Sequence, residues 1–129
     1  MKIAIFENEY EQVRTSFELV NELFFENSLK YDVFVSSQDF GDFKNIIQYS
    51  LILIDIDLSL KSELDGYSLI KEILKIKTNA KIIILTGASR VSEKLKELKM
   101  PNYPILLKPL SYQNIYDEFK KILPPKIEK

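Results

Sequence analysis

The sequence predicts an α/β fold: a doubly wound, five-stranded parallel sheet with helices on both faces. Short apolar runs of strand length alternate along the chain with longer stretches whose apolar residues recur every three or four positions. The most apolar run, LILIDI, is nearly continuous, which is typical of a central strand buried on both faces. Five such strand–helix pairs favour parallel strands joined by right-handed crossovers.

The five predicted strands are short and rich in β-branched and aliphatic residues, which suit a pleated, buried surface. In chain order they are Lys2–Phe6, Tyr31–Val35, Leu51–Ile56, Ala80–Leu85 and Pro104–Leu107. In a parallel sheet all five run in one direction, so the residues that follow them meet at one edge.

The five predicted helices are Tyr10–Asn27, Asp39–Gln48, Gly66–Ile76, Ser89–Leu98 and Tyr112–Leu123. All but the fourth, whose apolar stripe is weak, have a clear apolar face. The residues predicted to face the core are Val13, Phe17, Val20, Leu23 and Phe24; Phe40, Phe43, Ile46 and Ile47; Leu69, Ile70, Ile73 and Leu74; and Ile115, Phe119 and Ile122. Two prolines then stop the last helix. We therefore expect one domain over residues 1–123 and a short tail over 124–129.

Composition agrees with a soluble globular protein. The 129 residues, 46% of them hydrophobic, suffice for one sizeable core. Basic and acidic residues number 18 and 19, so bulk charge favours neither nucleic acid nor an anionic membrane. The lysines around Lys71–Lys81 are interrupted by Glu72 and indicate a solvated helix face. With no signal-peptide pattern and no apolar run of transmembrane length, a cytoplasmic location is expected.

Three scarce residue types exclude much of the usual chemistry. The chain has no Cys and no His, which rules out thiolate metal sites, cysteine nucleophiles and Ser-His-Asp triads. Its three glycines cannot form a P-loop or a GxGxxG turn. Carboxylates, hydroxyls, lysines and a hard metal ion remain.

Polar side chains of this kind lie at the carboxyl ends of four of the predicted strands: Glu7 and Asn8, Asp55 and Asp57, Thr86, and Lys108. A carboxylate such as Asp55, directly after LILI, costs several kcal/mol if it is buried, charged and unpaired. Clustered carboxylates repel each other unless a cation joins them, and an all-oxygen ligand set favours Mg²⁺. An aspartate beside such an ion, with a lysine and a hydroxyl nearby, can attack phosphorus. The pattern indicates an aspartyl-phosphate site.

From Lys2 to Leu123 the chain resembles the receiver domain of two-component response regulators, which has a flavodoxin-like (βα)5 fold. The resemblance rests on five segments in the family's order: KIAIFENE, LILIDIDL, DGY, IIILTGA and ILLKPL. It implies that Asp55 is the phosphoacceptor and that Thr86 and Lys108 hold the phosphoryl oxygens. It also implies that Mg²⁺ is held by Glu7, Asn8, Asp55 and the backbone carbonyl of Asp57. The Lys108–Pro109 peptide bond is expected to be cis.

The same resemblance implies a signalling role. The donor would be a phosphohistidine on a histidine kinase or a histidine phosphotransfer protein. Phosphorylation would switch a surface formed by the fourth helix, fifth strand and fifth helix toward an unknown downstream protein or a second copy of the chain. Such a domain is not an enzyme, beyond catalysing its own phosphorylation and dephosphorylation.

The chain departs from the family's pattern at three points. Asn8 stands where a second carboxylate is usual, and we hypothesise that Asp57 compensates. The loop Leu58–Leu64 is longer than usual and lacks the customary proline. Ile105 stands where the fifth strand usually carries an aromatic residue, and Tyr103 is expected to point elsewhere.

Two alternatives stay open. A degenerate receiver would act as a phosphorylation-independent interaction module, which Asn8 and Ile105 favour. A phosphatase of the haloacid-dehalogenase type would use Asp55 as nucleophile and Asp57 as acid/base, but its DxD motif normally lies on the first strand.

Overall fold

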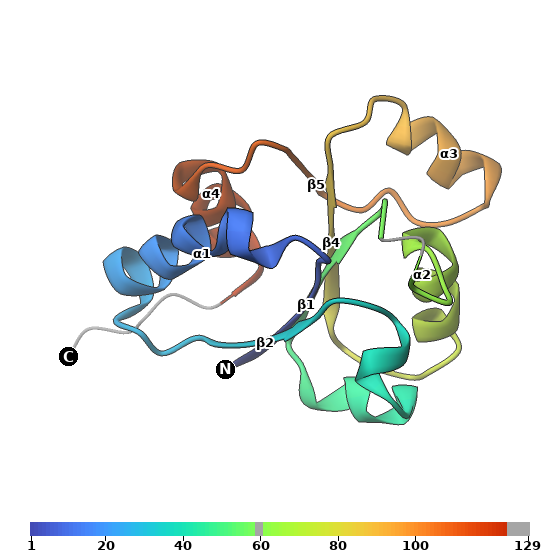
Figure 1. Ribbon diagram of the computed structural model, residues 1–129, viewed down its shortest axis with the longest axis horizontal. Helices are drawn as coiled ribbons and strands as arrows, with labels where there is room; N and C mark the ends of the chain where they lie inside the picture. Colours follow the sequence, from blue (N-terminus) through green and yellow to red (C-terminus); the bar gives the residue numbers. More distant parts are fainter. Residues whose placement is uncertain (59–60, 124–129) are drawn as a thin grey trace.

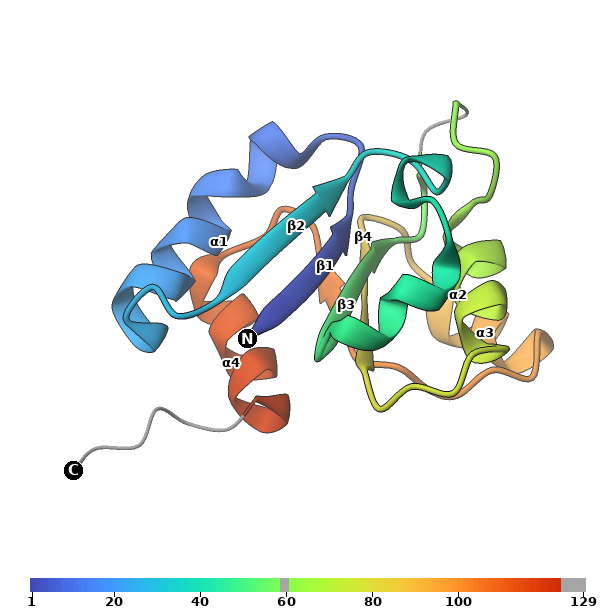
Figure 2. The ribbon, with the colours of Figure 1, turned by 90° about the horizontal axis from the view of Figure 1, so that it is seen from below.

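The computed structural model describes residues 1–58 and 61–123, which form one five-stranded sheet in the order β2-β1-β3-β4-β5 (Figures 1 and 2). Every neighbouring pair of strands is parallel. The strands are β1 (Lys2–Phe6), β2 (Lys30–Phe34), β3 (Leu51–Asp55), β4 (Lys81–Thr86) and β5 (Ile105–Leu107). The doubly wound, flavodoxin-like α/β fold is thereby confirmed.

Within residues 1–58 and 61–123, four α-helices and two 3₁₀ helices cover the sheet. They are α1 (Tyr10–Phe25), η1 (Gln38–Phe40), η2 (Phe43–Gln48), α2 (Gly66–Leu74), α3 (Val91–Glu97) and α4 (Tyr112–Ile122). Helices α1 and α4 lie on one face, and η2, α2 and α3 lie on the other (Figure 2). No helix of the described residues is both long and apolar enough to cross a membrane.

The core has two layers, one on each side of the sheet. On the α1/α4 side, the rings of Phe17, Phe25 and Phe119 pack against β1, β3 and β4. On the other side, Ile46 and Ile70 belong to the second layer. All five residues of β3 are buried, as the continuous apolar run predicted.

The prediction of a helix over Asp39–Gln48 was wrong. The chain forms η1 and η2, separated at Gly41, whose φ of 85° is in the left-handed region. A 3₁₀ helix has three residues per turn, so Phe43 and Ile46 share the inward face. Ile47, predicted to be in the core, is left 64% exposed.

The sequence pattern also overestimated the buried width of two helices. Leu23 of α1 is 55% exposed and Leu74 of α2 is 50% exposed, although both were predicted to face inward. The sheet covers only part of a wide apolar helix face, so the outermost positions stay in solvent. The predicted tail, 124–129, and residues 59–60 of the loop Leu58–Leu64 lie outside the described residues.

Candidate functional site

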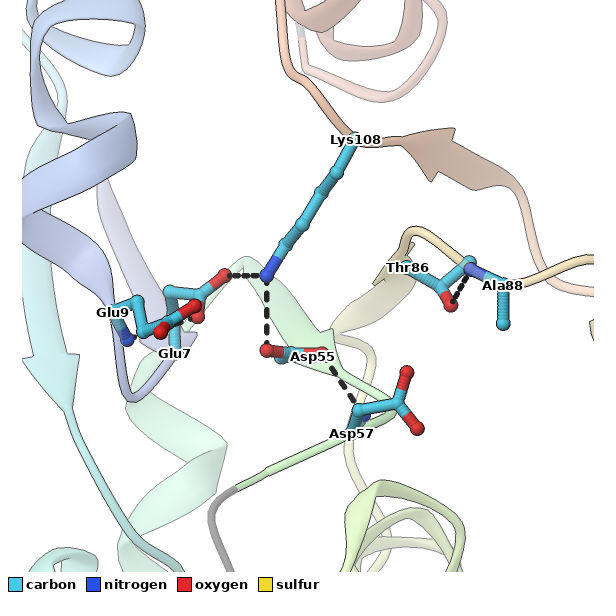
Figure 3. Close-up of polar contacts among 7 residues, drawn as sticks. All are labelled: Glu7, Glu9, Asp55, Asp57, Thr86, Ala88 and Lys108. Carbon is cyan, nitrogen blue, oxygen red and sulfur yellow. Dashed lines mark hydrogen bonds and ion pairs between the residues drawn. The ribbon is translucent and has the colours of Figure 1, made fainter.

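The site lies where the strand order reverses, between β1 and β3, at the carboxyl ends of the strands. From β1 the chain turns outward to β2, and from β3 it turns the opposite way to β4. Open parallel sheets bind ligands at such a switch point, because the two connections leave a crevice between them. Glu7 follows β1 and Asp55 ends β3, so the fold places both carboxylates at this crevice (Figure 3).

Lys108 joins the two carboxylates. Its Nζ lies 2.6 Å from Oε1 of Glu7 and 3.0 Å from Oδ2 of Asp55 (Figure 3). Glu7 is 0% exposed and Asp55 3% exposed, whereas the Lys108 side chain is 25% exposed. The lysine therefore closes the pair on the solvent side, and its ammonium supplies the positive charge that two buried carboxylates need.

The charges of this cluster do not balance, because it holds two carboxylates and one ammonium. Burial raises the pKa of Glu7, with a further increase from Asp55, while Lys108 and the backbone N–H of Glu9 act to lower it. Burial tends to lower the pKa of Lys108, but its hydrogen bonds to Glu7 and Asp55 outweigh this, so the pKa lies above its ordinary value. Lys108 thus stays charged, and the cluster favours a further cation.

The remaining oxygens of the two carboxylates are held by the backbone. Oε2 of Glu7 accepts a hydrogen bond of 3.0 Å from the N–H of Glu9. Oδ1 of Asp55 accepts one of 2.9 Å from the N–H of Asp57, whose own side chain is exposed. Asp55 is therefore oriented from two sides, by the backbone on Oδ1 and by Lys108 on Oδ2.

Gly66 allows α2 to begin directly against the end of β3. A Cβ at this position would lie 2.5 Å from Cα of Ile56 and 2.7 Å from the carbonyl oxygen of Asp55, which is closer than real contacts allow. Asp65 caps the helix by accepting a hydrogen bond of 2.8 Å from the N–H of Ser68. The Asp-Gly pair stands out in the sequence, but only the packing reveals why glycine is required.

Thr86, at the end of β4, is fully buried on the far side of Asp55 from Glu7 (Figure 3). Its Oγ1 accepts a hydrogen bond of 2.9 Å from the N–H of Ala88 and has no bond to Asp55 or Lys108 among the described residues. The next strand is tied to it, because the N–H of Lys108 donates to the carbonyl of Thr86 at 2.8 Å. The Lys108–Pro109 bond is cis, as expected.

The structure thus gathers Glu7, Asp55 and Lys108 and places Thr86 beside them. The side chain of Asn8 makes no hydrogen bond to any described residue, and that of Asp57 lies outside the cluster. Over residues 1–58 and 61–123, no group of three or more Asp, Glu, His or Cys could hold a metal ion. The donor set at the crevice, carboxylate and backbone oxygens with excess negative charge, still fits a hard cation such as Mg²⁺ that keeps several waters.

Sequence reasoning missed a polar network beside the site. The N–H of Ser37, just after β2, donates to Oγ of Ser62 at 2.9 Å, and the N–H of Leu64 donates to Oγ of Ser37 at 3.0 Å. Ser37 is buried and Ser62 and Leu64 are half-buried, so these partly buried bonds join the loop after β2 to the loop after β3. Serines in polar loops carry no sequence signal for such a contact.

No family model matches the chain, and no curated protein matches it by sequence. Solved structures do match. A receiver domain of a DNA binding response regulator from Colwellia psychrerythraea 34H has a TM-score of 0.74 at 20% identity, covering 95% of this chain and 98% of that one. A two-component response regulator from Clostridium difficile has a TM-score of 0.72 at 23% identity, covering 95% of each chain.

A third structure is a CheY-like receiver domain protein from Methanospirillum hungatei JF-1, with a TM-score of 0.72 at 16% identity. It covers 93% of this chain and 90% of its own. The chain therefore has the fold of response regulator receiver domains over nearly its whole length. The fold implied by the five sequence segments is confirmed.

Proposed function

We propose that this protein is a receiver in a two-component phosphorelay and that Asp55 accepts the phosphoryl group. The receiver fold supports a signalling role of this kind. The observation that carries the proposal is the contact of Lys108 with both Glu7 and Asp55 at the switch point of the sheet. An ion pair with only a structural role would not need two buried carboxylates for one lysine.

In the proposed step, a carboxylate oxygen of Asp55 attacks the phosphorus of a partner's phosphohistidine. A P–O bond forms, the P–N bond breaks, and the released imidazole takes up a proton. Lys108 neutralises the transferring oxygens, and the hydroxyl of Thr86 donates to one of them after leaving Ala88. When bound, Mg²⁺ would supply further positive charge, held by Glu7, Asn8, Asp55 and the backbone carbonyl of Asp57.

Phosphorylation would reach the surface through β4 and β5, because Thr86 ends β4 and Lys108 directly follows β5. With the Asp39–Gln48 helix replaced by η1 and η2, the proposed switching face is formed by α3, β5 and α4. A hollow of 420 Å³ lies there between the start of α3 and the side chains of Ile105 and Leu107, and Leu107 is largely exposed. A downstream protein or a second copy of the chain would bind this face.

The test is the intact mass of the protein after incubation with a small-molecule phosphodonor, with and without Mg²⁺. We expect a Mg²⁺-dependent phosphoryl adduct that is absent from Asp55→Asn. Asp39→Asn, which alters an exposed aspartate on η1, is the matched control and keeps the adduct. An adduct of equal size on Asp55→Asn would contradict the assignment.

One observation favours a second candidate, the degenerate receiver that binds partners without phosphorylation. Asn8 is neutral where the family's pattern has a second carboxylate, so the site has one negative charge fewer than that pattern, and the Asn8 side chain makes no hydrogen bond to any described residue. No adduct, together with no Mg²⁺ binding by calorimetry, would select this candidate. A phosphatase would instead turn over a generic phosphomonoester rapidly, and Asp57→Asn would abolish that turnover.

A further inference from the structure

Two adjoining hollows lie at the end of the sheet opposite Asp55. Their volumes are 870 and 680 Å³, and they share Lys77, Thr78, Ala80, Lys81 and Ile122 as lining. We call them together the basal trough. The turns leading into β3 and β4, the N-terminus and the end of α4 all gather at this end of the molecule (Figure 2). The trough therefore lies away from the Asp55 site, and it shares no lining residue with the hollow of 420 Å³ on the proposed switching face. Of α3, β5 and α4, it is lined only by Ile122, the last residue of α4.

The trough exposes apolar side chains that the sequence pattern would bury. Ile47 and Leu74 were both expected in the core, and the structure leaves each at least half exposed, lining this trough. Met1 is a third large apolar residue exposed there. Apolar surface left in water forgoes about 25 cal/mol per Å², and exposed large apolar side chains gathered around adjoining hollows are typical of interaction sites.

The charge on the trough has one sign. Its lining includes Lys75, Lys77 and Lys81 but no Asp or Glu among the described residues. Lys75 pairs with Glu72 at 3.0 Å, outside the lining, whereas Lys77 and Lys81 have no ion-pair partner among the described residues. The whole chain carries a net charge of −1, so this unbalanced positive patch is a local departure.

We propose that the basal trough docks an acidic, amphipathic peptide segment of another protein. The segment's apolar side chains would cover Ile47 and Leu74, and its carboxylates would pair with Lys77 and Lys81. A second copy of the chain would bring lysines against lysines, and the stretch 124–129, PPKIEK, has more lysine than glutamate. A flat membrane would touch the rim of a concave trough and leave its walls uncovered.

The probe is a fluorescein-labelled synthetic helix with leucines on one face and glutamates on the other; the same helix with lysines replacing the glutamates is the control. Binding is followed by fluorescence anisotropy at low salt, and the site is mapped by NMR amide shifts. We expect the glutamate helix to bind about tenfold tighter than the lysine helix, with shifts centred on the trough. No binding, or shifts centred elsewhere, would overturn the proposal.

Matched variants locate the effect. Leu74→Glu should weaken binding about tenfold and Lys81→Glu about fivefold, because one removes apolar contact and the other turns attraction into repulsion. Leu23→Glu on α1 and Lys96→Glu on α3 change residues that are also exposed but lie outside the trough, and they should leave the affinity unchanged. Equal affinities for trough and control variants would refute the proposal.

Two further measurements distinguish the peptide-docking trough from a membrane surface and from the Asp55 site. If phosphatidylserine-containing vesicles bind the protein and Leu74→Glu abolishes that binding while the glutamate helix does not bind, the trough is a membrane surface and the proposal fails. Asp55→Asn should bind the glutamate helix like the unmodified protein, because the trough lies at the other end of the sheet. The two proposals are therefore tested independently: a failure to phosphorylate Asp55 would not argue against peptide docking at the trough, and a failure of peptide docking would not argue against phosphorylation of Asp55.

Discussion

Replacing Lys108 with methionine tests whether one ammonium holds two buried carboxylates in place. Methionine keeps much of the apolar stem and removes the charge that lies 2.6 Å from Glu7 and 3.0 Å from Asp55. Removing one partner of a buried ion pair costs about 3–5 kcal/mol, because the other is left buried and uncompensated. Since a quarter of the Lys108 side chain is exposed, solvent screening points to the lower end, about 3 kcal/mol at pH 7.

The stability lost in Lys108→Met should be larger at neutral pH than at acidic pH. The pKa of Lys108 is raised on folding, so its contribution is present below the ordinary value of 10.5 and is lost as pH rises through the folded value. The pKa of Glu7 is raised above its ordinary value of 4.5, so ionisation of Glu7 lowers the stability of the folded state as pH rises from 4.5 through the folded-state pKa. Without Lys108 this weakening grows. The difference between variant and unmodified protein should therefore be largest near neutral pH and shrink toward pH 4.

The assay is urea unfolding followed by circular dichroism at pH 7 and pH 4. Lys94→Met is the matched control, because its pair with Glu97 spans 4.0 Å between exposed side chains and should contribute under about 0.5 kcal/mol. Adding Glu7→Gln to Lys108→Met should recover part of the loss. Identical unfolding midpoints for Lys108→Met and the unmodified protein at pH 7 would refute the reasoning.

Three other predictions concern single side chains. Gly66→Ala should lower stability by about 1–3 kcal/mol in the same urea assay, because the added Cβ would clash with the backbone of Ile56. Gly87→Ala is the control and should lower stability little, because a Cβ there would lie 4.0 Å from its nearest neighbour. Equal losses of stability in the two variants would contradict this prediction. Tyr103→Phe should leave stability unchanged or raise it by about 1 kcal/mol, because the hydroxyl is buried with no hydrogen-bond partner among the described residues; a clear loss would reveal a partner. Burial and a 2.8 Å hydrogen bond to Asp32 raise the pKa of Tyr49 to about 12, so Asp32→Asn should lower it in an NMR titration of the ring.

The strands, and the polar residues at their carboxyl ends, could be predicted from local sequence. Each of the five strands begins and ends within one residue of its predicted bounds. Continuous β-branched runs such as LILI are buried on both faces wherever a parallel sheet forms, so their local pattern suffices. The polar residue that ends each run must then lie at the carboxyl edge, which is how the sequence pattern selects Asp55, Thr86 and Lys108.

The helical layer depended on the tertiary structure. The spacing of apolar residues in the sequence cannot distinguish Ile46, which is buried, from Ile47, which is exposed. Whether the segment forms an α-helix or a 3₁₀ helix depends on the break at Gly41 and the cap at Asp42. The exposure of Leu74, at the outer edge of α2, likewise depends on tertiary structure, since only the width of the packed sheet determines whether this side chain is covered.

The sequence by itself determined the α/β order, the central strand and the set of residues that form the candidate site. Only the tertiary structure decided which of them meet: Lys108 contacts Glu7 and Asp55, Thr86 bonds to Ala88, and Asn8 takes no part in the cluster. It also decided that Ile47 and Leu74 line a lysine-rich trough at the opposite end of the sheet. The physical reason is that the apolar, β-branched runs that predict strands are local features of the sequence, whereas contacts between strand ends and the exposure of helix edges depend on how distant segments pack.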